Sequence, residues 1–411
     1  MTAIPRLPWP AALTTTPGWS RDLSRRRLAG LAATTWSTVS ALSASVLDVP
    51  QFEFKLAAGE HLHILVGIAA DLEERLHELG SAPDTRQLSP RHRRQVTSTL
   101  AADAATLRVG LIYGYWLPRL AGEFEGLRGE VDTLLDGPTA DLVRRADEQL
   151  RHVRRWGDAA VAAACSDGSW ADAARALDET VADDSEPWPV RPRDGARDER
   201  FHSFSHTRDY RRSADWVEGD SPYESDLIEL LRVNRDEIDA IETFALSIFD
   251  LIRKGPIEAL THLARLAWDE ARHAATGDLV LRERGLDPYA FSCSLIGIKV
   301  RAGMDGYDPW AQITLFGELG IIGPMRALAR AAHAAGDQRT ADVFDFICTD
   351  ETLHLRQSRE LLDRLHPAGG LERVAETVRA RAAERIAELG IMKEEEFLAL
   401  SREEIFALIG E

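Results

Sequence analysis

The pattern Asp-Glu-x-x-His occurs twice in this chain, at residues 269–273 and 350–354, and it constrains the fold more than any other feature. On a helix, residues three apart share one face, so the glutamate and the histidine of each copy point the same way. We therefore predict that both copies lie on helices and that each supplies a carboxylate and an imidazole to a metal site. The predicted ligands from the two copies are Glu270, His273, Glu351 and His354.

Each copy is preceded by a glutamate that stands alone in an apolar stretch. Glu242 lies upstream of Asp269, and Glu318 lies at a similar distance upstream of Asp350. The helical neighbours of both glutamates are apolar, which predicts that their carboxylates enter a core. Burying a charge there is costly unless a cation compensates it. We therefore predict that Glu242 and Glu318 complete the metal site.

Composition excludes several classes of protein. The net charge of −18 argues against nucleic acid or an anionic membrane surface as a partner, because both reward clustered Lys and Arg. The three cysteines show no paired or CxxC spacing, so we expect a reducing, cytoplasmic location and no thiolate metal site. No apolar run is long enough for a transmembrane helix, and no membrane partner is predicted.

Apolar spacing predicts an all-α chain with four parts. Residues 1–165 should form an N-terminal helical domain, and residues 166–220 an aromatic and charged linker with a short helix near 170–182. Residues 221–365 should form the metal domain, and residues 366–411 a C-terminal helical extension. The helices predicted in the N-terminal domain span about 21–46, 52–80, 90–130 and 138–165.

The metal domain should contain two helix hairpins. Gly255-Pro256 and the Gly336-Asp337 pair punctuate short connections, whereas the connection over 286–307 is long. Two hairpins joined by one long crossover is the connectivity of ferritin-like bundles. The four predicted helices span about 221–254, 256–284, 308–335 and 337–365.

Residues 221–365 resemble the ferritin-like di-iron carboxylate superfamily, whose signature is one Glu from each of two helices and Glu-x-x-His from each of the other two. The resemblance implies a four-helix bundle with a dinuclear metal centre and some bridging glutamates. It also implies that the aspartates before the two glutamates accept hydrogen bonds from the histidines and fix their tautomers. No organic cofactor site and no catalytic residue beyond the metal ligands is predicted. One metal would be held by Glu242, Glu270 and His273, the other by Glu318, Glu351 and His354, with Asp269 and Asp350 behind them.

Oxygen and nitrogen donors without thiolate favour iron or manganese over zinc. The resemblance implies two iron ions and a non-haem di-iron oxidoreductase, an oxidase or monooxygenase that uses dioxygen to oxidise a small organic, biosynthetic substrate. A di-manganese or mixed manganese–iron centre that disproportionates peroxide, and a ferroxidase, remain as alternatives. Hydroxylation, N-oxygenation, desaturation and cleavage are all compatible with these ligands. Electrons for the reaction could come from a separate reductase. The sequence also leaves a homodimer open as the oligomeric state.

The N-terminal domain contains fragments of the same pattern. Glu60 and His63 have Glu-x-x-His spacing, but in the pair Glu148 and His152 the histidine comes one position later, about 100° further around the helix than in the Glu-x-x-His pattern. Glu123 or Glu125 could supply a further carboxylate. We interpret this domain as a candidate degenerate copy of the bundle without an intact metal site.

Overall fold

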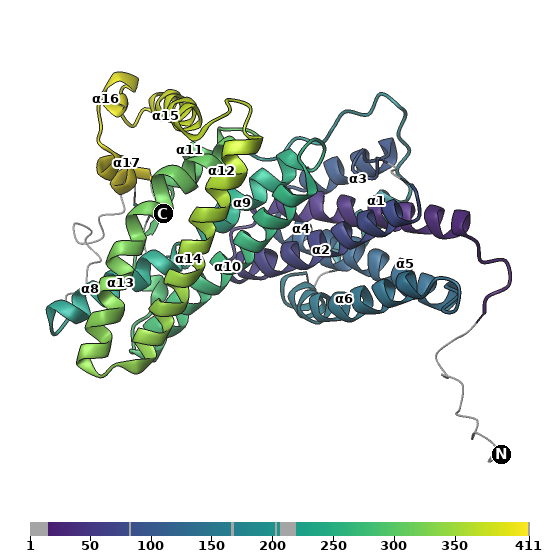
Figure 1. The fold of residues 1–411 in the computed structure, drawn as a ribbon, viewed down its shortest axis with the longest axis horizontal. Coiled ribbons are helices and arrows are strands. Elements are labelled where there is room, and N and C mark those ends of the chain that lie inside the picture. The colour runs from purple at the N-terminus through teal and green to yellow at the C-terminus, as the bar shows by residue number, and fades with distance from the viewer. Residues whose placement is uncertain (1–14, 82–83, 166–167, 202–203, 206–218, 410–411) are drawn as a thin grey trace, which may run out of the picture. The chain divides into compact units, whose positions relative to one another are not determined.

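The computed structural model of the protein describes residues 15–81, 84–165, 168–201, 204–205 and 219–409 (Figure 1). These residues are mostly helical, with a single pair of two-residue strands among them, so the all-α prediction is confirmed. In the described part of the chain, no helix has both the length and the hydrophobicity to cross a bilayer.

The chain divides into two compact units, and two long helices contribute to both. The sequence placed residues 40–63 in the N-terminal domain, whereas their contacts put them in the second unit. The first unit contains Met1–Val39 and Ile64–Pro189, and the second contains Ser40–His63 and Val190–Glu411.

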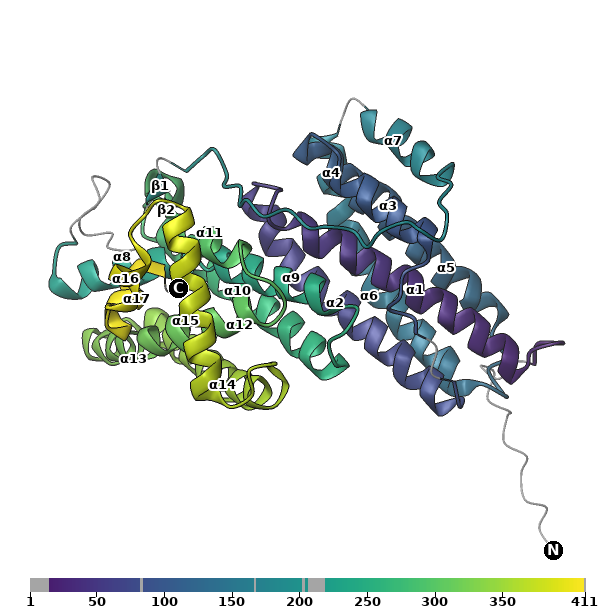
Figure 2. The same cartoon turned by 90° about the horizontal axis from the view of Figure 1, so that it is seen from above.

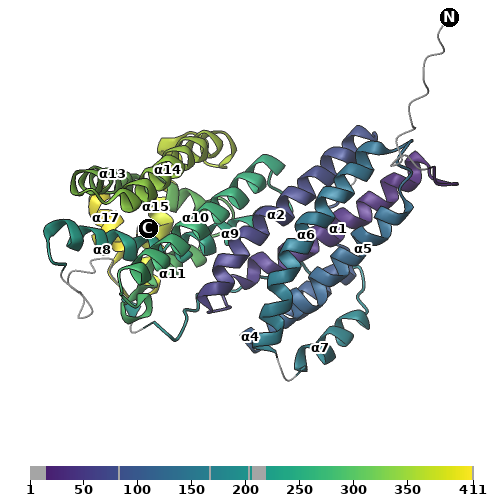
Figure 3. The same cartoon turned by 90° about the horizontal axis from the view of Figure 1, so that it is seen from below.

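The first unit is built from helices near the predicted positions (Figure 3). α5 packs along α6, α4 contacts α7, and Trp36 Nε1 of α1 donates to Glu73 Oε1 of α2 at 2.9 Å. The predicted helix over 90–130 is divided, because residues 101–104 leave the helical conformation. The elements are α1 (Arg21–Ser45), α2 (Phe52–Glu78), α3 (Pro90–Leu100), α4 (Ala105–Leu111), the π-helix η1 (Ile112–Trp116), α5 (Leu117–Glu130), α6 (Gly137–Ala164) and α7 (Ser169–Asp178).

The second unit contains the predicted metal domain (Figure 2). α10 packs against α8 and α9, α13 packs against α14, and contacts of α10 with α14 and of α8 with α13 join the two pairs. The helices are α8 (Pro222–Arg235), α9 (Ile238–Leu251), α10 (Ile257–Glu283), the 3₁₀-helix η3 (Pro288–Ala290), α11 (Ile296–Ala302), α12 (Asp308–Gln312), the π-helix η4 (Ile313–Gly317), α13 (Glu318–Ala335), α14 (Gln338–Leu365), α15 (Leu371–Glu388), α16 (Glu394–Leu398) and α17 (Arg402–Ile409).

Local sequence signals explain where these helices begin and end. The Ser221 side chain accepts from the N–H of Glu224 at the start of α8, and the Asp337 side chain caps α14 by accepting from the N–H of Thr340. Gly336 adopts a φ of 77° at the end of α13, a conformation that glycine takes without steric cost. The α13–α14 hairpin therefore turns where the sequence predicted.

The predicted helix over 221–254 is two helices, because the chain breaks at Asp236 and Glu237. The Asp236 carboxylate accepts from the guanidinium of Arg235 at 2.6 Å and from the N–H of Ser294 at 3.1 Å. These bonds hold the Asp236 side chain at the break. The break places Glu237 at the first turn of α9.

The long crossover and the helix after it are also irregular. The crossover contains η3, α11 and the strand β2 (Cys293–Ser294), which pairs in parallel with β1 (Phe204–Ser205). The predicted helix over 308–335 consists of α12, η4 and α13, and Pro324 lies inside α13. η4 ends at the residue before Glu318, whose side chain lies outside the described residues.

Candidate metal centre

Four buried side chains meet in the core of the second unit. Glu237 comes from the α8–α9 break, Glu270 and His273 from α10, and Glu351 from α14. Each offers one nitrogen or oxygen atom, and these four atoms all lie within 4.8 Å of one another. None of the four residues is more than 2% exposed. Such a group of carboxylates and imidazole is the donor set of an oxygen- and nitrogen-ligated metal.

The glutamates of the two Asp-Glu-x-x-His copies lie between the two histidines. Glu270 has Oε2 3.0 Å from Nδ1 of His273 and Oε1 3.2 Å from Nδ1 of His354. Glu351 has Oε1 3.1 Å from His273 Nδ1 and Oε2 3.8 Å from His354 Nδ1. Each carboxylate thus presents one oxygen to each histidine. The cluster of Glu237, Glu270, His273 and Glu351 could hold a metal ion.

The position beside His273 has a further donor, because Glu237 Oε2 lies 3.3 Å from His273 Nδ1. The side chain of Glu318, predicted as a ligand near His354, lies outside the described residues, and only the sequence spacing can be compared. Glu237 precedes Glu270 by the same number of positions as Glu318 precedes Glu351. The backbone of Glu318 begins α13.

Several cluster atoms are buried without a hydrogen bond, although they lie close to one another. They include both oxygens of Glu351, Oε1 of Glu270, Oε2 of Glu237 and Nδ1 of His354. A buried polar atom without a partner costs about 1–3 kcal/mol, and native proteins contain few of them. These atoms converge on a shared space in which three carboxylates compete for the same two histidine nitrogens, which fits a divalent cation between them.

The pKa values of Glu237, His273 and His354 are all raised, so the buried cluster favours bound protons. Burial, reinforced by the carboxylates of Glu270 and Glu351, raises the pKa of Glu237 to about 8. Burial alone would lower the pKa of His273, but Glu270 and the other acceptors outweigh it and raise that pKa well above its usual value. The same balance raises the pKa of His354. Metal ions displace such protons when they bind.

The two aspartates hold the histidines crosswise. His354 Nε2 lies 3.0 Å from Oδ2 of Asp269, and His273 Nε2 lies 3.3 Å from Oδ2 of Asp350. Each aspartate therefore contacts the histidine of the other copy. An Nε2–H that donates to a carboxylate leaves Nδ1 unprotonated toward the cluster, as a metal ligand requires.

Arginines keep these aspartates ionised. The Arg272 guanidinium donates to Asp269 and, at 2.7 Å, to Asp350, and Arg265 Nε donates to Asp269 at 2.7 Å. Burial would raise the pKa of Asp269, but the bonds from His354 and the two arginines lower it well below its usual range. Arg272 thus links the two Asp–His pairs.

Glu242 is not brought into the cluster, which corrects the prediction that it would be a ligand there. Its carboxylate is fully buried and contacts Lys55 Nζ and, at 2.7 Å, Arg197 Nη1. Lys55 also donates to the carbonyls of Val46 and Ala196, each at 3.0 Å. The step from Glu237 to Glu242 corresponds to a turn of about 140° around a helix, so both cannot face the cluster.

Glu237 is the ligand candidate that the sequence reasoning missed. The available signal was the repeated sequence separation, because Glu237 lies as far before Glu270 as Glu318 lies before Glu351, whereas Glu242 lies nearer to Glu270. The cations that hold Glu242 had no comparable signal, since Lys55 and Arg197 both lie far from it in the sequence.

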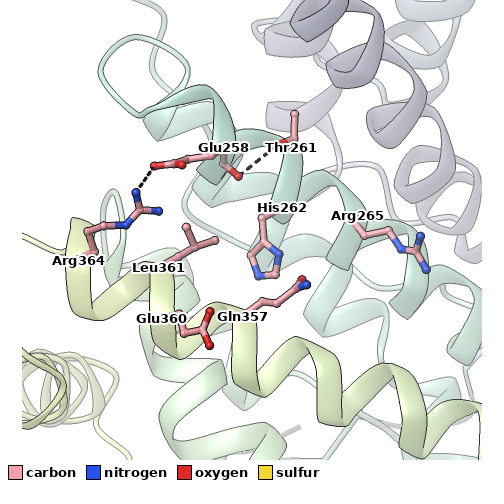
Figure 4. Close-up of a pocket in the computed structure, with 8 residues that line it drawn as sticks. All are labelled: Glu258, Thr261, His262, Arg265, Gln357, Glu360, Leu361 and Arg364. Atoms are coloured by element: carbon pink, nitrogen blue, oxygen red, sulfur yellow. Dashed lines mark hydrogen bonds and ion pairs between the residues drawn. The ribbon is translucent and has the colours of Figure 1, made fainter.

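A cleft of about 590 Å³ opens between α10 and α14 (Figure 4). His262 Nε2 lies 2.9 Å from Ser358 Oγ, and Arg364 pairs with Glu258 at 3.0 Å. Arg265 lines the cleft and also contacts Asp269. The cleft is lined by Glu258, Thr261, His262, Arg265, Gln357, Glu360, Leu361 and Arg364.

The metal-site fragments of the N-terminal region are not brought together. Glu148 and His152 are exposed on α6 in the first unit. Glu60 and His63 belong to the second unit, where the His63 ring stacks on Trp268 with centroids 4.7 Å apart. Glu123 is half-buried and Glu125 is exposed, both on α5.

Comparison with known proteins found no relative of this chain. No family model, no curated protein and no solved structure matches the chain. The function is therefore argued from the geometry of the centre.

Proposed function

We propose that residues 221–365 form a ferritin-like four-helix bundle with a dinuclear non-haem iron centre, and that the protein is an oxidase or oxygenase that uses dioxygen to oxidise a small polar organic molecule. One observation carries the proposal. Glu270 and Glu351 each present one oxygen to His273 and the other to His354, which is the arrangement of two carboxylates that bridge two metals.

The proposed ligand set is balanced in charge. His273 and Glu237 would hold one iron, His354 and Glu318 the other, and the two bridging glutamates would serve both. Four carboxylates and two neutral imidazoles neutralise two divalent ions, and this donor set favours iron or manganese. When bound, iron supplies the binding and reduction of dioxygen, for which the protein side chains have no equivalent.

The side chains around the ligands have separate tasks. Asp269 and Asp350 orient the imidazoles, and Arg272 holds both aspartates. The core of the second unit excludes water from the ligands, since none of those described is more than 2% exposed. All the lining residues of the cleft except Leu361 carry a charged or hydrogen-bonding group, which supports a substrate with polar groups.

The test is anaerobic loading of the purified full-length chain with Fe(II), followed by metal analysis and exposure to oxygen. The proposal predicts two irons per chain, oxygen consumption and an absorption transient. The variant Glu351→Gln should lose the oxygen consumption and the absorption transient. A chain that binds no metal would contradict the proposal.

Two other outcomes would reassign the function. Rapid release of oxygen from peroxide by the manganese-loaded protein, with no oxygen consumption by the iron form, would support a peroxide-disproportionating enzyme. Continued oxidation and uptake of iron far beyond two per chain would support a ferroxidase.

A further inference from the structure

The helical segment that carries Glu318 is irregular on both sides of this residue. η4 spans Ile313–Gly317 with π-helical bonding, and Pro324 follows inside α13. A single π-turn inserts one extra residue into a helix and is frequent at functional sites. Proline has no N–H to donate to the carbonyl one helical turn earlier, at Gly320. Regular helix bonding alone therefore does not hold the backbone around Glu318.

The C-terminal helix α17 supports this irregular segment directly. Arg402 at its start donates from Nη2 to the carbonyl of Leu315, inside η4. The Arg402 guanidinium carbon also lies 6.0 Å from the centroid of the Phe316 ring. The first residue of α17 thus contacts two neighbouring residues of the π-turn.

The other end of α17 reaches the residue before η4 through a buried arginine. Arg301 is fully buried, and its Nη1 donates to the carbonyl of Ile409 at 3.1 Å and to Oε1 of Gln312 at 2.7 Å. Its Nε donates to Thr243 on α9 at 2.8 Å. The end of α17 is therefore tied to the residue before the π-turn and to α9, the helix that follows Glu237.

Apolar contacts hold α17 in this place. Ile405 and Ile409 of α17 are about 1% exposed, and Phe316 of η4 packs against the same cluster. The buried members of this cluster are Ile296, Val300, Met304, Ala382, Ala383, Ile386, Phe397, Ile405 and Ile409.

We propose that α17 holds the backbone of the π-turn that leads into Glu318, and that Arg402 is the positioning residue that acts through this turn. The inference rests on the proposed dinuclear centre, in which Glu318 serves the iron beside His354. Without the bond from Arg402, the segment is free to relax to a regular helix. Loss of the one-residue π-turn would rotate the backbone position of Glu318 by about 100° relative to α12 and weaken the binding of that iron.

The experiment compares anaerobic Fe(II) titrations of the full-length wild-type chain, Arg402→Ala and Arg402→Lys. We expect Arg402→Ala to bind the first iron as the wild type does and the second iron about 10–100-fold more weakly, the range typical for loss of a group that supports a ligand. Arg402→Lys, which can still donate to the Leu315 carbonyl, should recover part of that affinity.

The matched control is Arg385→Ala. Arg385 Nε also donates across elements to a carbonyl, that of Lys299 at 3.3 Å, and it packs on the α11 side rather than on η4. This variant should bind both irons as the wild type does. Equal weakening of both irons in Arg402→Ala, or the same loss in Arg385→Ala, would overturn the role of α17 in favour of general destabilisation.

The proposal about α17 and the proposed function fail differently. A wild-type chain that binds no iron would overturn both. A wild-type chain that binds two irons, together with an Arg402→Ala variant that binds both equally tightly, would overturn the role of α17 alone.

Discussion

Glu237 and Glu242 lie close together near the start of α9, are both buried, and are compensated in opposite ways. Glu242 contacts two protein cations, Lys55 and Arg197. Glu237 faces two further carboxylates and a histidine. Apolar neighbours thus identify a carboxylate that needs compensation, but they do not show whether a side chain or a metal provides it.

The Glu242 ion pair and the cluster around Glu237 also differ in how many of their buried oxygens have a hydrogen-bond partner. The Glu242 carboxylate already has a cationic partner for each oxygen. The cluster around Glu237 keeps buried oxygens without a hydrogen bond on three different glutamates. A closed ion pair is a structural element, whereas the open cluster is stable in the core only when protons or metal ions enter it.

The largest expected effect is removal of a shared carboxylate. Glu351→Ala deletes one donor from both cation positions at once, so we expect the metal content to fall from two irons per chain to near zero. Metal analysis after anaerobic loading and gel filtration measures this. A variant that retains both irons would show that Glu351 is not shared.

The second prediction concerns the closed ion pair. Glu242→Ala leaves Lys55 and Arg197 buried without their anion, which should lower the free energy of unfolding by about 3–5 kcal/mol. Urea unfolding of the metal-free protein measures the change. The double variant Glu242→Gln with Lys55→Met removes one charge of each sign and should be less destabilised, and equal loss in both variants would contradict the ion-pair account.

The third prediction is that metal stabilises the fold through the cluster. A ligand present at a hundredfold excess over its Kd stabilises a protein by about 2.7 kcal/mol. Fe(II) or Mn(II) should therefore raise the urea midpoint of the wild-type chain under anaerobic conditions, and chelation should reverse the shift. His273→Ala should show a much smaller shift. An equal shift in this variant would place the metal elsewhere.

A smaller effect is expected from the aspartates. Asp350→Asn keeps the size of the side chain but weakens its hold on His273, so metal affinity should fall about 10–100-fold while the stoichiometry is retained. Asp269→Asn should do the same through His354. Competition with a coloured chelator measures both. Unchanged metal affinity in both variants would show that the crossed Asp–His pairs do not support metal binding.

Much of the fold followed from local sequence signals. The boundaries of α1, α2, α6, α10 and α14 lie within a few residues of the predicted ones, because caps, glycines and apolar spacing act over a few residues. Asp236 at the break accepts from the N–H of Ser294 in the distant crossover, and Leu315 in the π-turn accepts from Arg402 near the end of the chain. Such contacts exist only after the chain has folded.

The site shows the same division. The two Asp-Glu-x-x-His copies brought Glu270, His273, Glu351 and His354 together because their spacing is set within one helix turn. The partner of His273 was misassigned to Glu242, since that position depends on a helix break rather than on periodicity. The equal sequence separations in the two halves of the site would have pointed to Glu237.

The most direct test is the iron content of Glu237→Gln beside that of Glu242→Gln, each loaded anaerobically as the full-length folded protein. We predict that Glu237→Gln loses or greatly weakens one of the two irons, and that Glu242→Gln retains both. Two irons in Glu237→Gln together with loss of iron in Glu242→Gln would contradict the assignment and restore Glu242 as the ligand.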